Sequence, residues 1–221
     1  MKARSLLSHT LLLGAGVLLA TSAQATILTF DLDPAVPNYG DIPGNYGDNV
    51  NAASDAVGSY LVGNGYTPNV TTDYRTWQIS SDTVAYNNLD FWATGYGDLT
   101  NVAFSVVSGD HFAEITLVPE SGWAIRLNSF DIAGYYITDH PGSQVRILDG
   151  TSNTILVDYS PVTILGTGGT HSAFTPGLTH EGPLSIRFGY NDWNVGIDNI
   201  NFDQVAVVPE PETYAMLLIG L

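Results

Sequence analysis

The chain has 221 residues, with 22 acidic side chains against 6 basic ones, and it contains no cysteine. A net charge of −16 argues against nucleic acid as a partner, because binding to phosphates requires basic side chains. Disulfides and zinc sites built from thiolates are excluded, and the five histidines show no metal-ligand spacing.

The first 25 residues predict a signal peptide. Lys2 and Arg4 precede an apolar core from Leu11 to Ala20, and Ala23-Gln24-Ala25 forms a small-x-small cleavage site. The core is too short for a transmembrane anchor, which needs about 20 residues. Cleavage after Ala25 would leave 196 of the 221 residues, enough for one domain, and loss of two cations would change the net charge from −16 to −18.

The next segment predicts one strand and a long loop. Residues Ile27 to Phe30 have the composition of an opening strand, and a stretch rich in Gly, Pro and Asn follows from Asp33 to Val57. We expect a short helical turn within Ala52 to Val62.

Clearer strands follow, because apolar and polar residues alternate with a period of two. The alternation covers residues 113–117, 145–147, 155–159 and 184–190. The turn-rich link Asp149-Gly150-Thr151-Ser152-Asn153 predicts that residues 145–159 form a hairpin.

Two further runs change phase midway, which a regular strand cannot do while keeping one face buried. The first run, Trp123 to Ile132, predicts a β-bulge at Asn128-Ser129, and the second, Val195 to Phe202, predicts one at Asp198-Asn199. A simple edge irregularity or a strand buried on both faces is the alternative. Together these runs predict an all-β fold, an antiparallel, jelly-roll-like β-sandwich spanning residues 26–207.

The end of the chain carries a motif of its own. Val208, Pro209, Glu210 and Pro211 precede an apolar run from Tyr214 to Leu221, and this segment resembles the PEP-CTERM sorting tail of exported bacterial proteins. The resemblance implies processing by an exosortase, contact with the membrane only through the tail, and a location in the cell envelope, on the cell surface or outside the cell. A full tail of this type continues into a transmembrane helix and an arginine cluster, so residues 208–221 indicate a truncated one.

Two internal stretches, GWAIRLNSFDIAGYY (residues 122–136) and GPLSIRFGYNDWNVGIDNINF (residues 182–202), also resemble the β-sandwich modules of PEP-CTERM proteins. More loosely, they are similar to carbohydrate-binding jelly rolls whose last strand carries an Asp followed by alternating aliphatic residues.

A structural calcium ion is one hypothesis for the aspartates, which make up 17 of the 22 acids. Calcium takes six to eight oxygen ligands, and the first and last strands of a sandwich can supply them together. The candidate ligands are Asp31, Asp33 and Asp198, and the similar jelly rolls often use a late Asp in this way. The alternative is that Asp198 accepts hydrogen bonds from backbone amides in a turn.

Glycan binding is the second hypothesis, because sugar C–H faces stack on aromatic rings. Candidate clusters are residues 90–98, with Trp92 and Tyr96, residues 190–193, with Trp193, and the pair Tyr39 and Tyr46. Core packing is the alternative for any of these aromatic residues, and it is favoured for Trp77 and Trp123.

The chain therefore predicts an exported, non-enzymatic protein of the envelope or extracellular matrix that binds exopolysaccharide. A G-x-S-x-G motif is absent, and the histidines lack a local catalytic partner. A secreted polysaccharide hydrolase and a purely structural surface protein are the alternatives, and paired aspartates would serve the former.

Overall fold

A computed structural model describes residues 25–32, 36–51, 56–57, 60–61, 65–189 and 194–207. The predicted signal peptide up to residue 24, Asp33, Trp193 with its neighbours 190–192, and the tail from Val208 lie outside these ranges. Within them, no helix is long and apolar enough to cross a membrane.

Seventeen strands make up the described chain. They are β1 (Thr26–Leu28), β2 (Gly40–Asp41), β3 (Ala56–Val57), β4 (Tyr60–Leu61), β5 (Val70–Gln78), β6 (Thr83–Tyr86), β7 (Asp90–Trp92), β8 (Val102–Phe104), β9 (His111–Pro119), β10 (Trp123–Gly134), β11 (His140–Asp149), β12 (Ile155–Asp158), β13 (Val162–Ile164), β14 (Ser172–Phe174), β15 (Leu178–Glu181), β16 (Leu184–Gly189) and β17 (Val195–Ala206).

The strands form two large antiparallel sheets and one small one. The first large sheet has the order β14-β10-β17-β8-β7-β2, with β1 on β17 and β15 on β10. The second has the order β12-β11-β16-β9-β5-β6, with β13 on β11, and β3 pairs only with β4. Many neighbours are distant in sequence, as in β10–β17 and β9–β16, which is the crossed strand order of a jelly roll.

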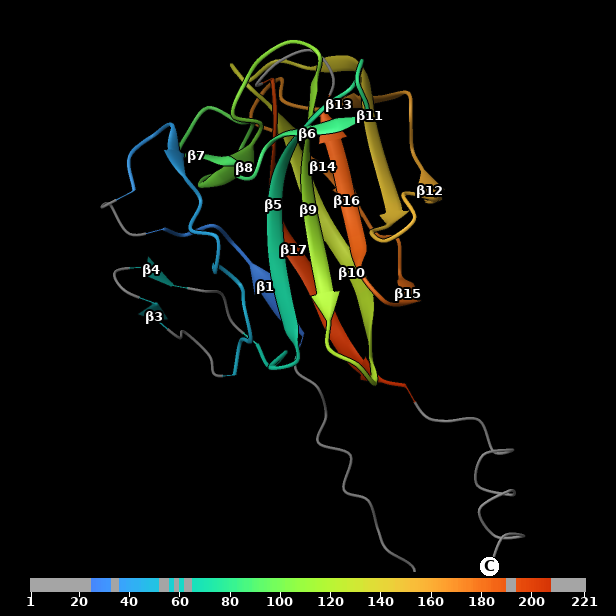
Figure 1. The fold of residues 1–221 in the computed structure, drawn as a ribbon. Coiled ribbons are helices and arrows are strands. Elements are labelled where there is room, and N and C mark those ends of the chain that lie inside the picture. The colour runs from blue at the N-terminus through green and yellow to red at the C-terminus, as the bar shows by residue number, and fades with distance from the viewer. Residues whose placement is uncertain are drawn as a thin grey trace, which may run out of the picture.

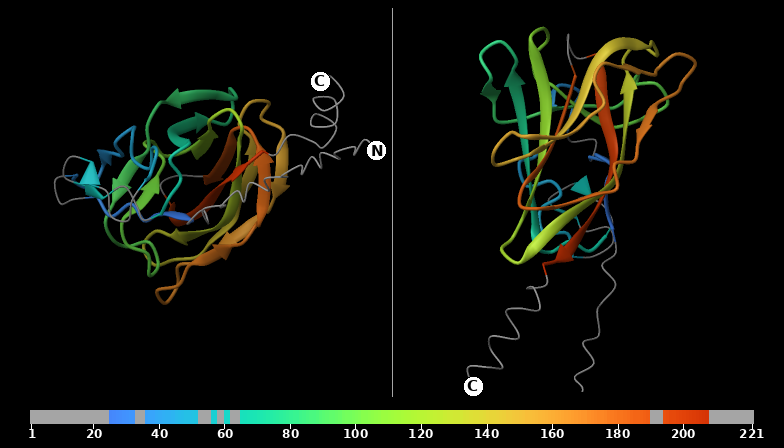
Figure 2. Two further views of the ribbon diagram at one scale, coloured as in Figure 1. Left: turned by 90° about the horizontal axis from the view of Figure 1, so that it is seen from below. Right: turned by 90° about the vertical axis from the view of Figure 1, so that its right-hand side faces the viewer.

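One hydrophobic core lies between the two large sheets, with β5, β9 and β16 crossing β10 and β17 (Figure 1). The inward positions alternate along each strand, as Ile115 and Leu117 of β9 show, and they meet Ile125 and Phe202 of the other sheet. Seen from below, the strands surround this core (Figure 2, left). The predicted all-β, antiparallel, jelly-roll-like sandwich is confirmed.

Both predicted β-bulges occur, and they lie opposite each other in the β10–β17 pair. The register runs from Leu127↔Phe202 through Ser129↔Asn201 to Asp131↔Asp198, so an extra residue on β10 is matched by one on β17. Asn199 adopts the left-handed conformation at this point, with φ of 52°. The compensating bulges keep the apolar side chains inward on both sides of the irregularity. The predicted hairpin is also confirmed, because β11 and β12 pair antiparallel.

The structure corrects several details in the first third of the chain. The predicted helical turn is wrong, because residues 56–57 and 60–61 pair as strands β3 and β4. The opening strand ends at Leu28 rather than Phe30, whose φ of 48° interrupts the extended backbone. Part of the predicted loop is strand β2, which pairs with β7.

The arginines gather on the outer face of the second sheet. Arg75, Glu114, Arg187, Arg146 and Asp158 occupy one continuous cross-strand row over five strands. The Arg187 Nε donates to Glu114 Oε2 over 2.7 Å, and its guanidinium lies 4.2 Å from the centre of the Trp77 ring. Trp77 is 9% exposed and lies against this row on the outer face of the sheet, not in the core between the sheets. Arg146 and Arg187 are paired within the row, and Arg75 pairs with Asp73 of its own strand.

Candidate functional site

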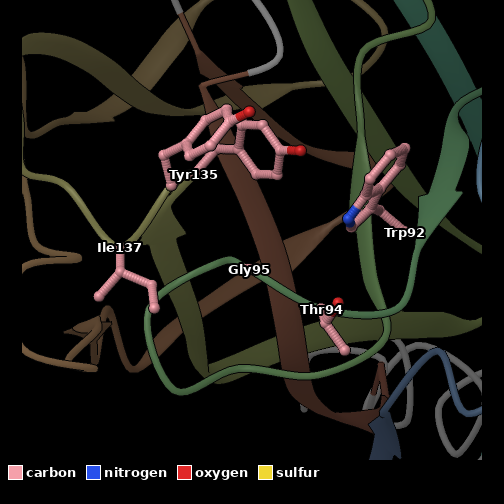
Figure 3. A pocket seen from close by; sticks show the side chains of 6 residues that line it. Trp92, Thr94, Gly95, Tyr135 and Ile137 are labelled. Atoms are coloured by element: carbon pink, nitrogen blue, oxygen red, sulfur yellow. The ribbon is translucent and has the colours of Figure 1, made fainter.

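A cleft of about 260 Å³ opens between the loop that joins β7 to β8 and the segment that follows β10. We call it the aromatic cleft, and its lining residues are Trp92, Thr94, Gly95, Tyr135, Tyr136 and Ile137. Trp92 lies on one side, Tyr135 and Ile137 lie on the other, and the loop carrying Thr94 and Gly95 runs between them (Figure 3).

Large apolar side chains are exposed around this cleft, although burial would normally remove them from water. Tyr136 is 80% exposed, Tyr39 53% and Ile137 49%. The Tyr39 and Trp92 ring centroids are 4.6 Å apart, and those of Trp92 and Tyr135 are 5.8 Å apart, both edge-to-face. The rings thus support one another in a continuous aromatic surface that remains open to a ligand.

A second, smaller core holds the aromatic cleft from below, on the outer face of the first sheet. It contains Tyr96, Leu99, Val102, Phe104 and Ala133, with Trp92 and Tyr135 packed against it. This core needs space above the sheet, and the sequence provides it with small residues at two paired positions.

Those positions are Ala133 of β10 and Gly196 of β17, which lie directly opposite each other. A Cβ atom on Gly196 would lie 2.6 Å from Val102 Cγ2 and 3.1 Å from Tyr96 Cδ1. Only a glycine therefore lets the Tyr96 ring lie against the sheet.

The loop that carries the cleft is fixed by backbone hydrogen bonds at both ends. Asn101 N donates to Ala93 O over 3.0 Å, and Gly97 N donates to Gly134 O over 3.0 Å. Gly97 has φ of 53°, and a Cβ atom there would lie 2.0 Å from Thr170 O, so this close approach requires glycine.

The structure separates the aromatic residues that the sequence grouped together. Trp92 lines the cleft, whereas Tyr96 is 1% exposed and lies beneath it as a support. Tyr39 joins Trp92, but Tyr46 is fully buried in the main core, where its hydroxyl accepts a hydrogen bond from Phe30 N. The prediction that Tyr39 and Tyr46 form one surface cluster is therefore wrong.

Sequence reasoning missed Tyr135, Tyr136 and Ile137, which form one wall of the cleft. The available signal was three large apolar residues in succession directly before Thr138-Asp139, a pattern that period-two alternation does not explain. Trp193 lies outside the described residues, and the chain resumes at Asn194, whose carbonyl accepts a hydrogen bond from Tyr135 N over 2.7 Å.

A separate acidic cluster comprises Asp31, Asp131 and Asp198. Asp198 is 5% exposed and lies opposite Asp131 in the β10–β17 pair. Burial raises the pKa of Asp198 to about 8, and the charges of Asp31 and Asp131 add to this rise against the opposing effect of the Asn199 amide. Asp198 therefore favours its protonated form at neutral pH.

Neighbouring polar groups hold the acidic cluster in place. Asn101 Nδ2 donates to Asp31 Oδ1 over 2.6 Å, and Asn199 Nδ2 donates to Asp131 Oδ2 over 3.1 Å. His171 lies between Asp98 and Asp131, with its Nδ1 2.9 Å from Asp98 Oδ1.

The structure thus brings together Asp31 and Asp198, two of the predicted calcium ligands, and adds Asp131. Asp33 lies outside the described residues. Within the described ranges, no three His, Asp or Glu side chains form a group that could hold a metal ion. Asp198 Oδ1 also accepts a hydrogen bond from Asn199 N over 2.7 Å, as the alternative interpretation expected.

No protein-family model matches the chain, and no curated protein matches it. Among solved structures, one described as "CBM4 structure and function" is 14% identical, covers 60% of this chain and 86% of its own, and has a TM-score of 0.31. Another, TmCBM61 in complex with beta-1,4-galactotriose, is 14% identical, covers 62% of this chain and 87% of its own, and has a TM-score of 0.20. With TM-scores this low, neither likeness bears on the function of this chain.

The Gly196→Val substitution tests how the cleft is supported. The new side chain would collide with Val102 and Tyr96, so we expect a loss of about 1 to 3 kcal/mol in the free energy of unfolding. Urea denaturation measures this loss. Gly44→Ala is the matched control, because a Cβ at Gly44 meets nothing within 4 Å. Equal stability of the two variants would contradict the packing described here.

Proposed function

We propose that the aromatic cleft binds a sugar residue of a polysaccharide. The observation that supports this is the exposed aromatic surface of Trp92, Tyr135 and Tyr136, which stays open although it is held firmly from below. Aromatic rings present an apolar face to sugar C–H groups, while the Tyr and Thr hydroxyls hydrogen-bond to sugar hydroxyls.

We further propose that the cleft binds without catalysing a reaction. Glycosidases place two carboxylates around the scissile bond. None of the six residues that line the cleft carries a carboxylate, an imidazole or a thiol, so binding fits the lining better than hydrolysis does.

Replacing Trp92 or Tyr136 by Ala should weaken retention in gels that contain the ligand polysaccharide. Loss of one ring contact of about 0.5 to 1.5 kcal/mol corresponds to a roughly two- to tenfold weaker affinity. Affinity electrophoresis over a panel of bacterial exopolysaccharides and plant β-glucans measures the effect.

Tyr86→Ala is the matched control, because Tyr86 is also an exposed tyrosine, 45% exposed, but lies on β6 of the other sheet. Retention of both cleft variants at the wild-type level would exclude the cleft as the binding site. Turnover of a retained polysaccharide would exclude the non-catalytic proposal.

Export is also part of the proposal. The residues before Thr26 would direct secretion, and the segment from Val208 to Pro211 would present the chain to an exosortase at the cell envelope. In a bacterium that has an exosortase, N-terminal sequencing of the exported protein should begin at Thr26. An intact leader on a cytoplasmic protein would contradict this.

We propose that the acidic cluster binds a structural calcium ion, with Asp31 and Asp198 as carboxylate ligands. Calcium also accepts backbone carbonyls and water as ligands, so a calcium site can contain only two carboxylates. Burial, with a smaller contribution from repulsion by Asp31 and Asp131, raises the pKa of Asp198 to about 8, and a divalent cation would offset both effects.

Calcium should raise the melting temperature above pH 7, and a chelator should reverse the rise. Without the ion, the folded protein binds a proton at Asp198 that the unfolded chain, with a pKa of about 3.9, releases. The free energy of unfolding should therefore fall as the pH rises from about 4 to about 8. Calcium should remove this dependence on pH.

Asp198→Asn should abolish both the calcium-dependent rise in melting temperature and the fall in stability with rising pH, as measured in thermal unfolding scans. Asp73→Asn, on the other sheet, should leave both effects intact. If calcium does not change the melting temperature of the wild-type protein, the proposed calcium site is excluded.

A further inference from the structure

The lining of the aromatic cleft carries no charged side chain. The nearest segment adds a negative charge, because Asp139 accepts hydrogen bonds from Gly166 N and Thr167 N, which lower its pKa. Three of the four arginines of the domain lie on the other sheet, and the fourth, Arg126, is paired in register with Asp203. An anionic sugar would therefore meet the Asp139 carboxylate and no arginine, and the imidazole beside the cleft, that of His140, has its Nε2 3.2 Å from Tyr135 O.

The cleft also offers few hydrogen bonds. Its side chains supply the hydroxyls of Thr94, Tyr135 and Tyr136 and the indole N–H of Trp92. Two backbone N–H groups of the lining are already paired, since Ile137 N donates to Gly95 O over 3.3 Å and Tyr135 N donates to Asn194 O over 2.7 Å. A sugar hydroxyl that enters the cleft without a partner would lose its water and gain nothing in return.

Ile137 supplies an apolar wall at an unfavourable backbone position. Tyr136 and Ile137 have φ of 59° and 52°, so two successive residues adopt the left-handed conformation. For a β-branched residue such as Ile this conformation is strained, whereas Asn or Gly would adopt it readily. Strain of this kind persists where the surroundings enforce it, and it is concentrated at functional sites.

The surroundings do enforce this turn. A Cβ atom on Gly134 would lie 2.1 Å from Thr138 O, and a Cβ atom on Gly166 would lie 2.5 Å from the same oxygen. Both glycines are therefore needed for the chain to fold back. Thr138 Oγ1 donates to Tyr136 O over 3.1 Å. The turn is therefore built to present the Ile137 side chain, 49% exposed, to the cleft and to solvent.

We propose that the cleft selects an uncharged sugar that carries a methyl group, and that Ile137 is the residue that determines this specificity. The proposal rests on the proposed function of the cleft. A methyl group where a hydroxyl would otherwise face Ile137 removes a group that the Ile137 side chain cannot pair and adds apolar surface against it. Either a 6-deoxyhexose or an O-acetylated hexose presents this chemistry.

The test compares matched 2-hydroxyethyl glycosides, whose aglycone carries no methyl group, by NMR titration of the intact protein. In the gluco, galacto and manno series, the probes are the parent hexoside, its 6-deoxy form, its 6-O-acetyl form and the corresponding uronide. In at least one series the 6-deoxy or the acetyl probe should bind about tenfold more tightly than the parent, the range that one buried methyl group supplies. The 6-deoxy and 6-O-acetyl probes distinguish a methyl group that belongs to a deoxy sugar from one that belongs to an acetyl ester.

Two variants assign the effect to residue 137. Ile137→Val should keep the preference, whereas Ile137→Asn should reduce it to within about twofold. Ile137→Asn should unfold at the same temperature as the wild-type protein or a higher one, because Asn relieves the backbone strain. A folded Ile137→Asn variant that keeps the preference would overturn the role of Ile137.

The remaining outcomes separate this inference from the proposed function. Parent hexosides or uronides that bind as tightly as the methyl-bearing probes would overturn the inference, while binding in the cleft would stand. Retention of polysaccharide in gels without binding of any methyl-bearing probe would overturn it as well. Failure of every probe and of every polysaccharide would overturn both.

Discussion

The pairing of β10 with β17 is the constraint on which both candidate sites depend. These strands are antiparallel neighbours along most of their length, and their two bulges cancel each other. Because a slip by one residue would turn every side chain to the opposite face, the register must hold on both sides of the bulges at once. With that register, Ile132 and Ile197 face the main core, while Ala133 and Gly196 leave room for Tyr96 outside it. The same pairing sets Asp131 opposite Asp198.

The sequence predicted this part of the fold because its signal is local. Alternation with a period of two marks a strand that has one buried face, and a change of phase marks an extra residue. The phase change between Leu127 and Phe130 and the one between Ile197 and Ile200 could therefore be read without knowing that the two strands pair. What alternation does not give is the partner, so Asp131 was not recognised as a neighbour of Asp198.

The cleft was predicted only in part, because the burial of an aromatic residue depends on what packs against it from elsewhere in the chain. Tyr39 and Tyr46 lie in the same turn-rich segment, yet one is 53% exposed and the other fully buried. In the core, the Tyr46 ring packs 5.3 Å from the ring of Phe30, 16 residues away, and its hydroxyl accepts a hydrogen bond from Phe30 N. Tyr135, Tyr136 and Ile137 were missed for the opposite reason, since three successive large apolar residues suggest burial while the turn after β10 exposes two of them. The strands β3 and β4 are two residues each, too short for any periodicity to show.

The distribution of charge explains how an acidic protein can present an uncharged site. Neutralising an acidic surface near the cleft would require cations there, but three of the four arginines of the domain lie in the row across the second sheet, where Arg187 pairs with the buried Glu114. The first sheet instead offers aromatic rings, small residues and one strained aliphatic side chain around the cleft. The sugar binding proposed for the cleft would rest on shape and on the removal of apolar surface from water, both of which depend weakly on salt. The outer faces of the two sheets thus differ in chemistry, with ion pairing that stabilises the fold on one and apolar surface available for a ligand on the other.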